Sequence, residues 1–269
     1  MGTKDYVEKN NFRGVLIGSS GGIDSALTAA IAYDALGKGR VKTIMMPFDF
    51  TADISIEDAG LLAKNLGIEH SEISIKEMYE SFSLALEESF EGMGIDKTEE
   101  NLQSRCRGVT LMALSNKLGF LVLTTGNKSE AAVGYSTLYG DTAGGFSVLK
   151  DVSKTLVYEL ANYRNSLSVV IPKRIIERPP SAELAPDQKD TDSLPDYDRL
   201  DPIIEMYVED DKSIQEIINE GFDEKEVRRI VSLIDFNEYK RRQAPLGIKI
   251  SDRNFGKDRR YPITNSWKP

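Results

Sequence analysis

Short apolar runs alternate with helix-length stretches along the first 130 residues. The apolar runs predict strands over residues 14–17, 42–47, 70–76 and 120–125. Apolar positions at helical spacing predict helices over residues 25–36, 55–66, 77–90 and 100–118, the second with Ser55 as its N-cap. Strands interleaved with helices are typical of a parallel sheet with helices on both faces. We therefore expect an α/β fold of the Rossmann-like kind.

The pattern changes in the second half of the chain. Residues 136–145 are rich in Gly, Ser, Thr and Tyr, and residues 178–202 are rich in Pro, Asp and Ser. Both stretches are typical of active-site loops, and equally of disordered connectors. Residues 202–243 predict two or three short amphipathic C-terminal helices, with Gly221 at a helix end. We expect one domain over residues 1–269 that includes this helical part.

A glycine-rich segment, Gly18-Ser19-Ser20-Gly21-Gly22-Ile23-Asp24-Ser25, joins the first predicted strand to the first predicted helix. Adjacent glycines let the backbone fold closely around an anion, and the N–H groups and dipole of the following helix attract negative charge. The segment has no Gly-Lys-Ser/Thr ending and lacks the G-x-G-x-x-G spacing, which excludes two common nucleotide motifs. It predicts a different phosphate-binding loop; the alternative is a strand-to-helix turn without a ligand.

A second polar segment, residues 125–130, follows the fourth predicted strand. Because parallel strands end at one edge of a sheet, this segment and the glycine loop should open onto one crevice. Asp24 and Glu130 could then hold Mg²⁺, which prefers oxygen ligands and bridges carboxylates to phosphates. Each residue alone is also typical of an ordinary helix start. The pair predicts a magnesium site.

Composition excludes several classes of function. The formal net charge of −9 argues against an extended nucleic-acid-binding surface. We find no apolar run of membrane-spanning length and no signal peptide, so we expect a cytoplasmic protein without a membrane partner. One cysteine, Cys106, and one histidine, His70, offer neither an internal disulfide nor a Cys/His zinc cluster, and they disfavour Cys-His and Ser-His hydrolases. We interpret Cys106 as a packing residue and His70 as a strand-edge residue.

Seven blocks along the chain carry a family resemblance. They span residues 18–25, 46–47, 101–105, 125–130, 134–141, 180–184 and 238–241. Together they resemble the synthetase domain of the NAD synthetases, which are N-type ATP pyrophosphatases with an adenine nucleotide alpha hydrolase-like fold. The resemblance is closer to the glutamine-dependent branch than to the ammonia-dependent branch, because Leu138 replaces a lysine and residues 45–47 lack an arginine.

The resemblance implies a role for each site residue. Asp24 and Lys154 would be catalytic, and Asp24 and Glu130 would hold Mg²⁺. The ATP-binding residues would be Gly18, Ser19, Ser20, Gly21, Gly22, Ile23, Asp24, Ser25, Met46, Thr125, Lys154 and Ser181. The residues that contact deamido-NAD (nicotinic acid adenine dinucleotide) would be Asn101, Glu130, Asp141 and Lys240. We add Arg105, which lies four residues after Asn101 on the same helix face. Without the resemblance, Lys154 would be interpreted as a surface lysine.

The resemblance also implies a reaction. The carboxylate of deamido-NAD would attack ATP to give an acyl-adenylate and pyrophosphate, and ammonia would then displace AMP to give NAD. The family further implies a homodimer. We expect no amidase domain in this chain, so ammonia would come directly from solution or from an amidase partner. The alternatives are another ATP pyrophosphatase, such as a GMP-synthetase-like amidotransferase or a tRNA-thiolating enzyme, and a non-catalytic adenine nucleotide-binding module.

Overall fold

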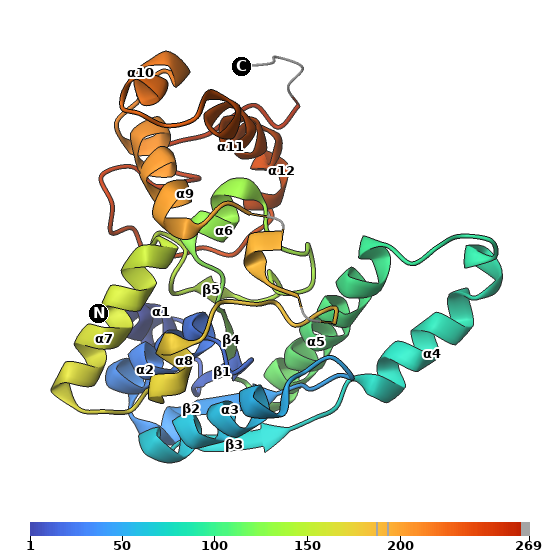
Figure 1. Ribbon diagram of the computed structural model, residues 1–269. Helices are drawn as coiled ribbons and strands as arrows, with labels where there is room; N and C mark the ends of the chain where they lie inside the picture. The colour runs from blue at the N-terminus through green and yellow to red at the C-terminus, as the bar shows by residue number, and fades with distance from the viewer. Residues whose placement is uncertain (187, 193, 265–269) are drawn as a thin grey trace.

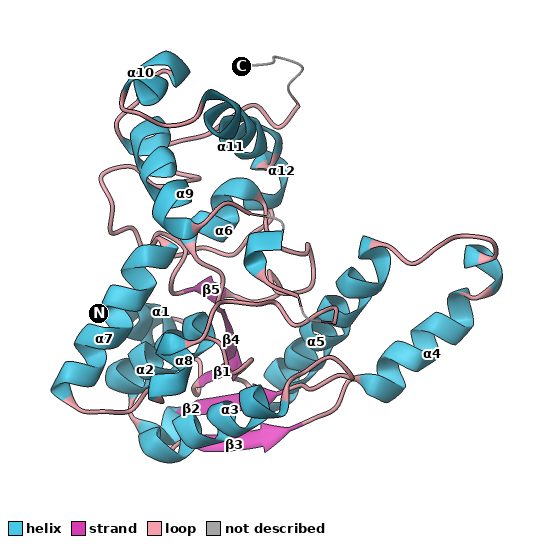
Figure 2. Ribbon diagram, viewed as in Figure 1, coloured by secondary structure: helices cyan, strands magenta, loops and turns pink. Residues whose placement is uncertain are grey.

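Five parallel strands form the sheet in the part of the chain that the structure describes, in the order β3-β2-β1-β4-β5 (Figures 1 and 2). The structure is a computed structural model that describes residues 1–186, 188–192 and 194–264. The strands are β1 (Val15–Gly18), β2 (Val41–Met45), β3 (Glu69–Glu72), β4 (Leu121–Thr124) and β5 (Phe146–Ser147). The predicted parallel α/β fold is confirmed.

Helices cover both faces of this sheet and form the C-terminal part (Figure 2). The α-helices are α1 (Gly2–Lys9), α2 (Ile23–Leu36), α3 (Asp53–Leu66), α4 (Lys76–Leu86), α5 (Lys97–Leu118), α6 (Lys128–Val133), α7 (Lys154–Leu167), α8 (Lys173–Glu177), α9 (Tyr197–Ile204), α10 (Ile214–Asn219), α11 (Glu224–Phe236) and α12 (Glu238–Arg241). Shorter turns are η1 (Lys38–Arg40), η2 (Glu88–Phe90), η3 (Asp190–Asp192) and the π-helical η4 (Glu205–Glu209). No helix in the described ranges is long and apolar enough to cross a membrane.

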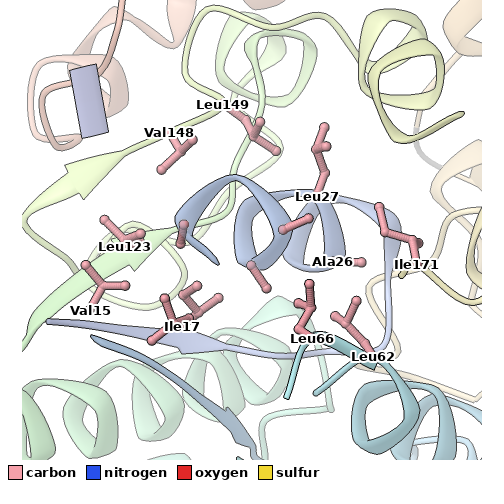
Figure 3. Packing of buried hydrophobic residues seen from close by; sticks show 14 of the residues in the cluster. Val15, Ile17, Ala26, Leu27, Leu62, Leu66, Leu123, Val148, Leu149 and Ile171 are labelled. Carbon is pink, nitrogen blue, oxygen red and sulfur yellow. The ribbon is translucent and has the colours of Figure 1, made fainter. Parts of the chain in front are cut away.

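Successive side chains of β1 point to opposite faces of the sheet and pack in two separate cores, one on each face. Val15 and Ile17 pack in a cluster with Leu27 of α2 and Leu62 of α3 (Figure 3). Leu16 points to the other face and packs in a cluster that contains Cys106 of α5. A strand buried on both faces reads as a continuous apolar run, which is why the sequence locates it. The interpretation of Cys106 as a packing residue is confirmed, since its side chain is buried in this cluster.

A third core lies among the C-terminal helices. Val133 of α6 packs there with Ile203 of α9 and Val231 of α11. Helix α6 follows β4 after a short turn, so the helical part is built directly onto the edge of the sheet where the strands end (Figure 1). The predicted amphipathic helices of residues 202–243 are therefore present, and they share one core with α6 at this edge of the sheet.

The strand order creates a crevice between β1 and β4. From β1 the chain proceeds through β2 to β3 on one side, and β4 then returns to the other side of β1, with Ile17 opposite Leu123. Ligands of open α/β sheets bind beyond the carboxyl ends of the strands at such a reversal. The glycine loop and residues 125–130 both leave the sheet at this point, as the sequence predicted.

Several predicted boundaries differ from the observed ones, and three of them show why. Helix α3 begins at Asp53 with Ala52 as N-cap, because the Ser55 hydroxyl instead donates to Glu183 at 2.7 Å. The strand predicted over residues 70–76 ends at Glu72. The loop predicted over residues 178–202 ends early, because α9 begins at Tyr197 and continues through Pro202. Helix α9 has a strongly buried apolar face, which outweighs the backbone hydrogen bond that a proline removes.

Candidate active site

The glycine loop is held in a tight turn between β1 and α2. Ser25 Oγ donates to the carbonyl of Gly22 at 3.0 Å, and the Gly22 N–H donates to Ser20 Oγ at 3.2 Å. Gly22 is the N-cap of α2, and no side chain among the described residues caps it. The first N–H groups of α2 are therefore available to a ligand, and the helix dipole adds positive partial charge. This geometry fits an anion.

Gly21 is required at its position for two reasons. Its φ of +77° lies in the left-handed region that side chains disfavour. A Cβ at Gly21 would also lie 2.3 Å from the Ser55 carbonyl oxygen in the first turn of α3. The loop is thus pressed against α3, and its shape depends on that contact.

We predict that Gly21→Ala raises the KM for ATP at least about tenfold, because the loop must move away from Ser55 and its N–H groups lose their alignment. Steady-state kinetics at saturating second substrate would measure the change. Gly67→Ala is the matched control: Gly67 has a φ of +64°, but a Cβ there meets nothing within 4 Å. This control is expected to lose about 1–2 kcal/mol of stability and to keep its KM. Equal KM changes in the two variants would contradict the prediction.

Three charged side chains meet beside the glycine loop. Lys154 Nζ lies 2.5 Å from Asp24 Oδ2 and 3.4 Å from Glu130 Oε1. The Lys154 side chain is 3% exposed and both carboxylate side chains are 17% exposed. The three residues begin α2, α6 and α7, so three helix starts bring them together. Asp24 and Glu130 lie at one crevice, as predicted, and Lys154 joins them, so it is not the surface lysine that its local sequence indicates.

Asn127 fixes the two carboxylates, and the sequence analysis missed it. Its Nδ2 donates to Asp24 Oδ1 at 2.9 Å, while its Oδ1 accepts from the N–H of Glu130 at 2.9 Å. Glu130 Oε2 accepts in return from the N–H of Asn127, which completes a capping box. An Asn followed three residues later by a Glu is a recognisable helix-start signature. That signal was available within residues 125–130.

Burial and mutual repulsion control protonation in this cluster. Burial, and then the charge of Asp24, raises the pKa of Glu130 above its ordinary value. Burial alone would lower the pKa of Lys154, but the charges of Asp24 and Glu130 raise it above its ordinary value. Lys154 therefore stays protonated, and a cation bound between the two carboxylates would relieve the repulsion that raises the pKa of Glu130. Such a pair fits Mg²⁺, which takes a few carboxylate oxygens and completes its shell with phosphate oxygens and water.

Two cavities adjoin the glycine loop. A cavity of about 170 Å³ is lined by Ser20–Ser25 together with Glu130 and Lys154. A second, of about 240 Å³, is lined by Gly18, Ser19 and Met46 and is more apolar. Thr125 and Ser181 line both cavities. The residues predicted to bind ATP therefore line these two adjoining cavities. One is polar enough for phosphates, and the other is suited to a base.

The residues predicted to bind deamido-NAD are organised around the loop of residues 136–145. Asn101 Oδ1 accepts from the Thr137 hydroxyl at 2.8 Å, and Arg105 Nε donates to the Leu138 carbonyl at 3.2 Å. Lys240 Nζ donates to the carbonyls of Gly134 and Ser136. All three side chains hold this loop, and their contact with substrate remains a prediction.

Asp141, also in that loop, lines both cavities beside the glycine loop. Its carboxylate accepts from the Thr137 N–H at 3.0 Å. Burial raises the pKa of Asp141 to about 6, opposed by that N–H and by Lys240. Of the residues predicted to bind deamido-NAD, Asp141 and Glu130 thus line the smaller cavity.

Four consecutive residues, 127–130, each contact a different part of the chain. Besides Asn127 and Glu130, described above, Lys128 Nζ lies 2.9 Å from Asp151 Oδ1 and 2.6 Å from Glu209 Oε1. The Ser129 hydroxyl donates to Asp201 of α9 and accepts from the N–H of Lys154. The start of α6 thus joins the sheet, the charged cluster of Asp24, Glu130 and Lys154, and the C-terminal helices.

Further residues of the site had no local signal. Arg107 Nε donates to the carbonyl of Met46 at 3.0 Å and lines the larger cavity. Asp190 lines the smaller cavity, and its carboxylate accepts from the Tyr197 hydroxyl at 2.8 Å. The Tyr197 ring lies 5.3 Å from Lys154 Nζ, in cation–π range. Their partners lie far away in the sequence or in the loop of residues 178–196, so no spacing rule reveals them.

Comparison with known proteins agrees with this geometry. A family model described as NAD synthase matches residues 2–244. The chain is 56% identical over 271 residues to the glutamine-dependent NAD(+) synthetase of Acinetobacter baylyi, covering 100% of this chain and 50% of that protein.

Solved structures also resemble this protein, two of them at more than 30% identity over most of this chain. One is a glutamine-dependent NAD+ synthetase from Acinetobacter baumannii in complex with ADP, at 52% identity and a TM-score of 0.66, covering 99% of this chain and 48% of that one. The other is an NMN synthetase from Francisella tularensis, at 31% identity and a TM-score of 0.75, covering 88% of this chain and 90% of that one.

The chain spans about half the length of the glutamine-dependent relatives it matches, 50% of one and 48% of another. The family match extends over the sheet, the glycine loop, the charged cluster and the helices up to α12. It therefore covers every element that forms the site described above. The chain belongs to the NAD synthase family.

Proposed function

We propose that this chain catalyses the ATP-dependent amidation of deamido-NAD to NAD, with release of AMP and pyrophosphate. The observation that carries the proposal is the glycine loop at the β1–β4 crevice, with the buried Lys154 beside it in contact with Asp24 and Glu130. A loop that presents N–H groups beside a buried lysine stabilises a leaving anion. The two Acinetobacter relatives named above are glutamine-dependent NAD synthetases, which supports the same reaction here.

The protein's part in the first step is to hold charge and geometry. The free N–H groups in the first turn of α2 would bind the phosphates, and the base would enter the cavity lined by Met46. Asp24 and Glu130 would hold Mg²⁺, which when bound neutralises the phosphates and polarises the reacting phosphorus. Lys154 would supply a fixed positive charge for the pyrophosphate.

The proposed reaction needs no activated nucleophile on the protein, because the substrate carboxylate is itself the nucleophile. A carboxylate oxygen of deamido-NAD attacks the α phosphorus of ATP, the bond from that phosphorus to the β-bridging oxygen breaks, and pyrophosphate leaves. Ammonia then attacks the acyl carbon, AMP leaves, and one proton is lost to give the amide. The site therefore needs positioning rather than a Ser or Cys nucleophile, which agrees with the roles proposed for Asp141 and Glu130.

Ammonia is proposed as the direct nitrogen donor for this chain alone. The glutamine-dependent relatives are about twice its length, so use of glutamine would require an amidase domain or partner. The chain is expected to form NAD with ammonium chloride and not with glutamine. Efficient turnover with glutamine by the purified chain would contradict this assignment.

We also propose a homodimer formed through α4 and α5. These helices and the segment between them project from the body of the molecule (Figure 1). They expose large apolar side chains: Phe82, Leu84, Phe90, Met93, Ile95, Val109 and Met112. An apolar surface of this extent marks a protein contact, and the family resemblance favours a second copy.

The double variant Leu84→Asp/Ile95→Asp is expected to convert the dimer to a monomer, because two charges would be desolvated in the contact. Light scattering after gel filtration would measure the mass. Leu167→Asp, an equally exposed site at the end of α7, is the control and should leave the dimer intact. A wild-type monomer, or an unchanged double variant, would refute the proposed surface.

Product analysis tests the function as a whole. Incubation with MgATP, ammonium and deamido-NAD is expected to yield NAD, AMP and pyrophosphate in equal amounts. Nicotinic acid mononucleotide, xanthosine monophosphate and tRNA are the comparison substrates, the first because one structural relative is an NMN synthetase. Preference for any of these would reassign the substrate. ATP binding without AMP formation would favour a non-catalytic nucleotide-binding module, and formation of ADP and orthophosphate would overturn the reaction class.

A further inference from the structure

Arg178 has a hydrogen-bond donor without an acceptor at the smaller cavity. The residue follows α8 and lines this cavity together with Gly21 and Gly22 of the glycine loop. Its Nη2 donates to Glu183 Oε1, whereas its Nη1 is shielded from solvent and has no hydrogen-bond partner within the described residues. Buried polar groups are nearly always paired, and the exceptions call for an explanation. A ligand that brings an acceptor into the cavity would provide the missing partner.

Glu183 fixes the other side of this guanidinium. Its Oε1 also accepts from the Ser55 hydroxyl at 2.7 Å, and its Oε2 accepts from the Ala52 N–H at 3.3 Å. Ala52 is the N-cap of α3 and has no side chain that can cap the helix, so Glu183 takes the place of a cap at this positive helix end. Glu183 holds a left-handed φ of +50°, a conformation that glutamate adopts only under constraint. Arg178 is therefore oriented by an anchored carboxylate.

Arg178 is the cation at this cavity that has a donor to spare for an anion. Among the described residues that line it, four are carboxylates (Asp24, Glu130, Asp141, Asp190) and two are cations (Lys154, Arg178). Lys154 already contacts two of the carboxylates. Arg178 has a donor without a partner and lies directly beside the glycine loop.

We propose that Arg178 binds the outer phosphates of ATP through Nη1 while Nη2 remains on Glu183. The inference rests on the proposed function and adds a phosphate-binding residue to it. A guanidinium suits the task because its planar fork can hold two acceptors at once, which an ammonium on a flexible stem does not. Since Arg178, Ser181 and Glu183 belong to one short segment, the phosphates would hold that segment against both cavities.

Ligand binding to the full chain, measured by calorimetry in the presence of Mg²⁺, tests the proposal. Arg178→Gln is expected to weaken the binding of ATP and of inorganic pyrophosphate about 10- to 100-fold. AMP lacks the outer phosphates, so its affinity should change less than about twofold. Arg178→Lys keeps the charge without the fork and is expected to weaken pyrophosphate binding as well, and it carries the test if the Gln variant does not fold. Arg228→Gln, which removes an arginine paired with Glu224 on α11, is the control and should change neither affinity.

The outcomes separate a phosphate contact from a structural role. An equal loss of AMP and pyrophosphate affinity would show that Arg178 merely holds its segment in place, and this would overturn the proposal. Unchanged pyrophosphate binding in the Gln variant would overturn it too. A wild-type chain that forms no AMP from ATP and deamido-NAD would refute the proposed function instead. A wild-type chain that forms AMP beside an unaffected Arg178→Gln variant would refute this inference alone.

Discussion

Asp24→Asn and Glu130→Gln are each expected to reduce pyrophosphate release by about 10³-fold, because each removes a carboxylate that would hold the metal at the phosphates. Assay of released pyrophosphate with saturating ATP and deamido-NAD would measure the loss. The amide variants keep the shape of the side chains, so Asn127 can still donate to position 24. The loss should appear in kcat, since it concerns charge at the reacting phosphorus.

The fold should survive both changes. Lys154 contacts Asp24 and Glu130 together, so each single variant leaves the buried lysine one carboxylate partner. Thermal unfolding should therefore stay close to that of the wild type. Asp34→Asn on the same helix, which removes a surface partner of Arg164, is the control and should keep near-normal turnover. Near-normal turnover in either site variant would refute the metal assignment.

Lys128→Met is expected to lower the free energy of unfolding by about 3–5 kcal/mol. Lys128 is 4% exposed at its side chain and lies between Asp151, which is 2% exposed, and Glu209. It also donates to Ser251 Oγ at 2.9 Å, which ties the C-terminal segment to the start of α6. Methionine would fill the space but leave two carboxylates close together without a cation. Urea unfolding monitored by circular dichroism would measure the change.

Lys212→Met provides the comparison for this effect. Lys212 pairs with Glu220 at 2.9 Å, but both side chains are substantially exposed. Exposed ion pairs contribute about 0–1 kcal/mol, so this variant should unfold nearly as the wild type does. Similar losses in both lysine variants would mean that the buried cluster at Lys128 contributes no more than a surface pair.

Local patterns were sufficient to predict four of the five strands of the described sheet and the two loops that follow β1 and β4. The glycine loop and residues 125–130 each stand next to a strand, so their positions followed from the strand pattern and the parallel topology. The strand β5 has only two residues and α1 has a polar sequence, and neither gives a readable period. The sequence pattern thus located the strands that are buried along most or all of their length, such as β1 and β4. It missed short or polar elements, whose formation depends on contacts with other elements.

Residues whose role depends on distant partners could not be found this way. Lys154 looks like a surface lysine until Asp24, 130 positions away, is placed beside it. Ser55 looked like a helix cap, but Glu183 competes for its hydroxyl from across the chain. Lys154 was predicted through the family resemblance alone, whereas Glu183 and Asp190 were missed. A charged side chain can be buried only when its partner is also present, and spacing along the chain does not encode that partner.

The pairing of β1 with β4 also has a consequence for how the protein reaches its native state. Val15 and Leu121 are neighbours in the sheet although more than a hundred positions separate them. Closing so long a span carries a large entropic penalty and is slow compared with the formation of helices. The crevice between the two strands does not exist before this closure. A refolding chain should therefore regain helical content early and affinity for a fluorescent adenosine analogue only in its slowest kinetic phase.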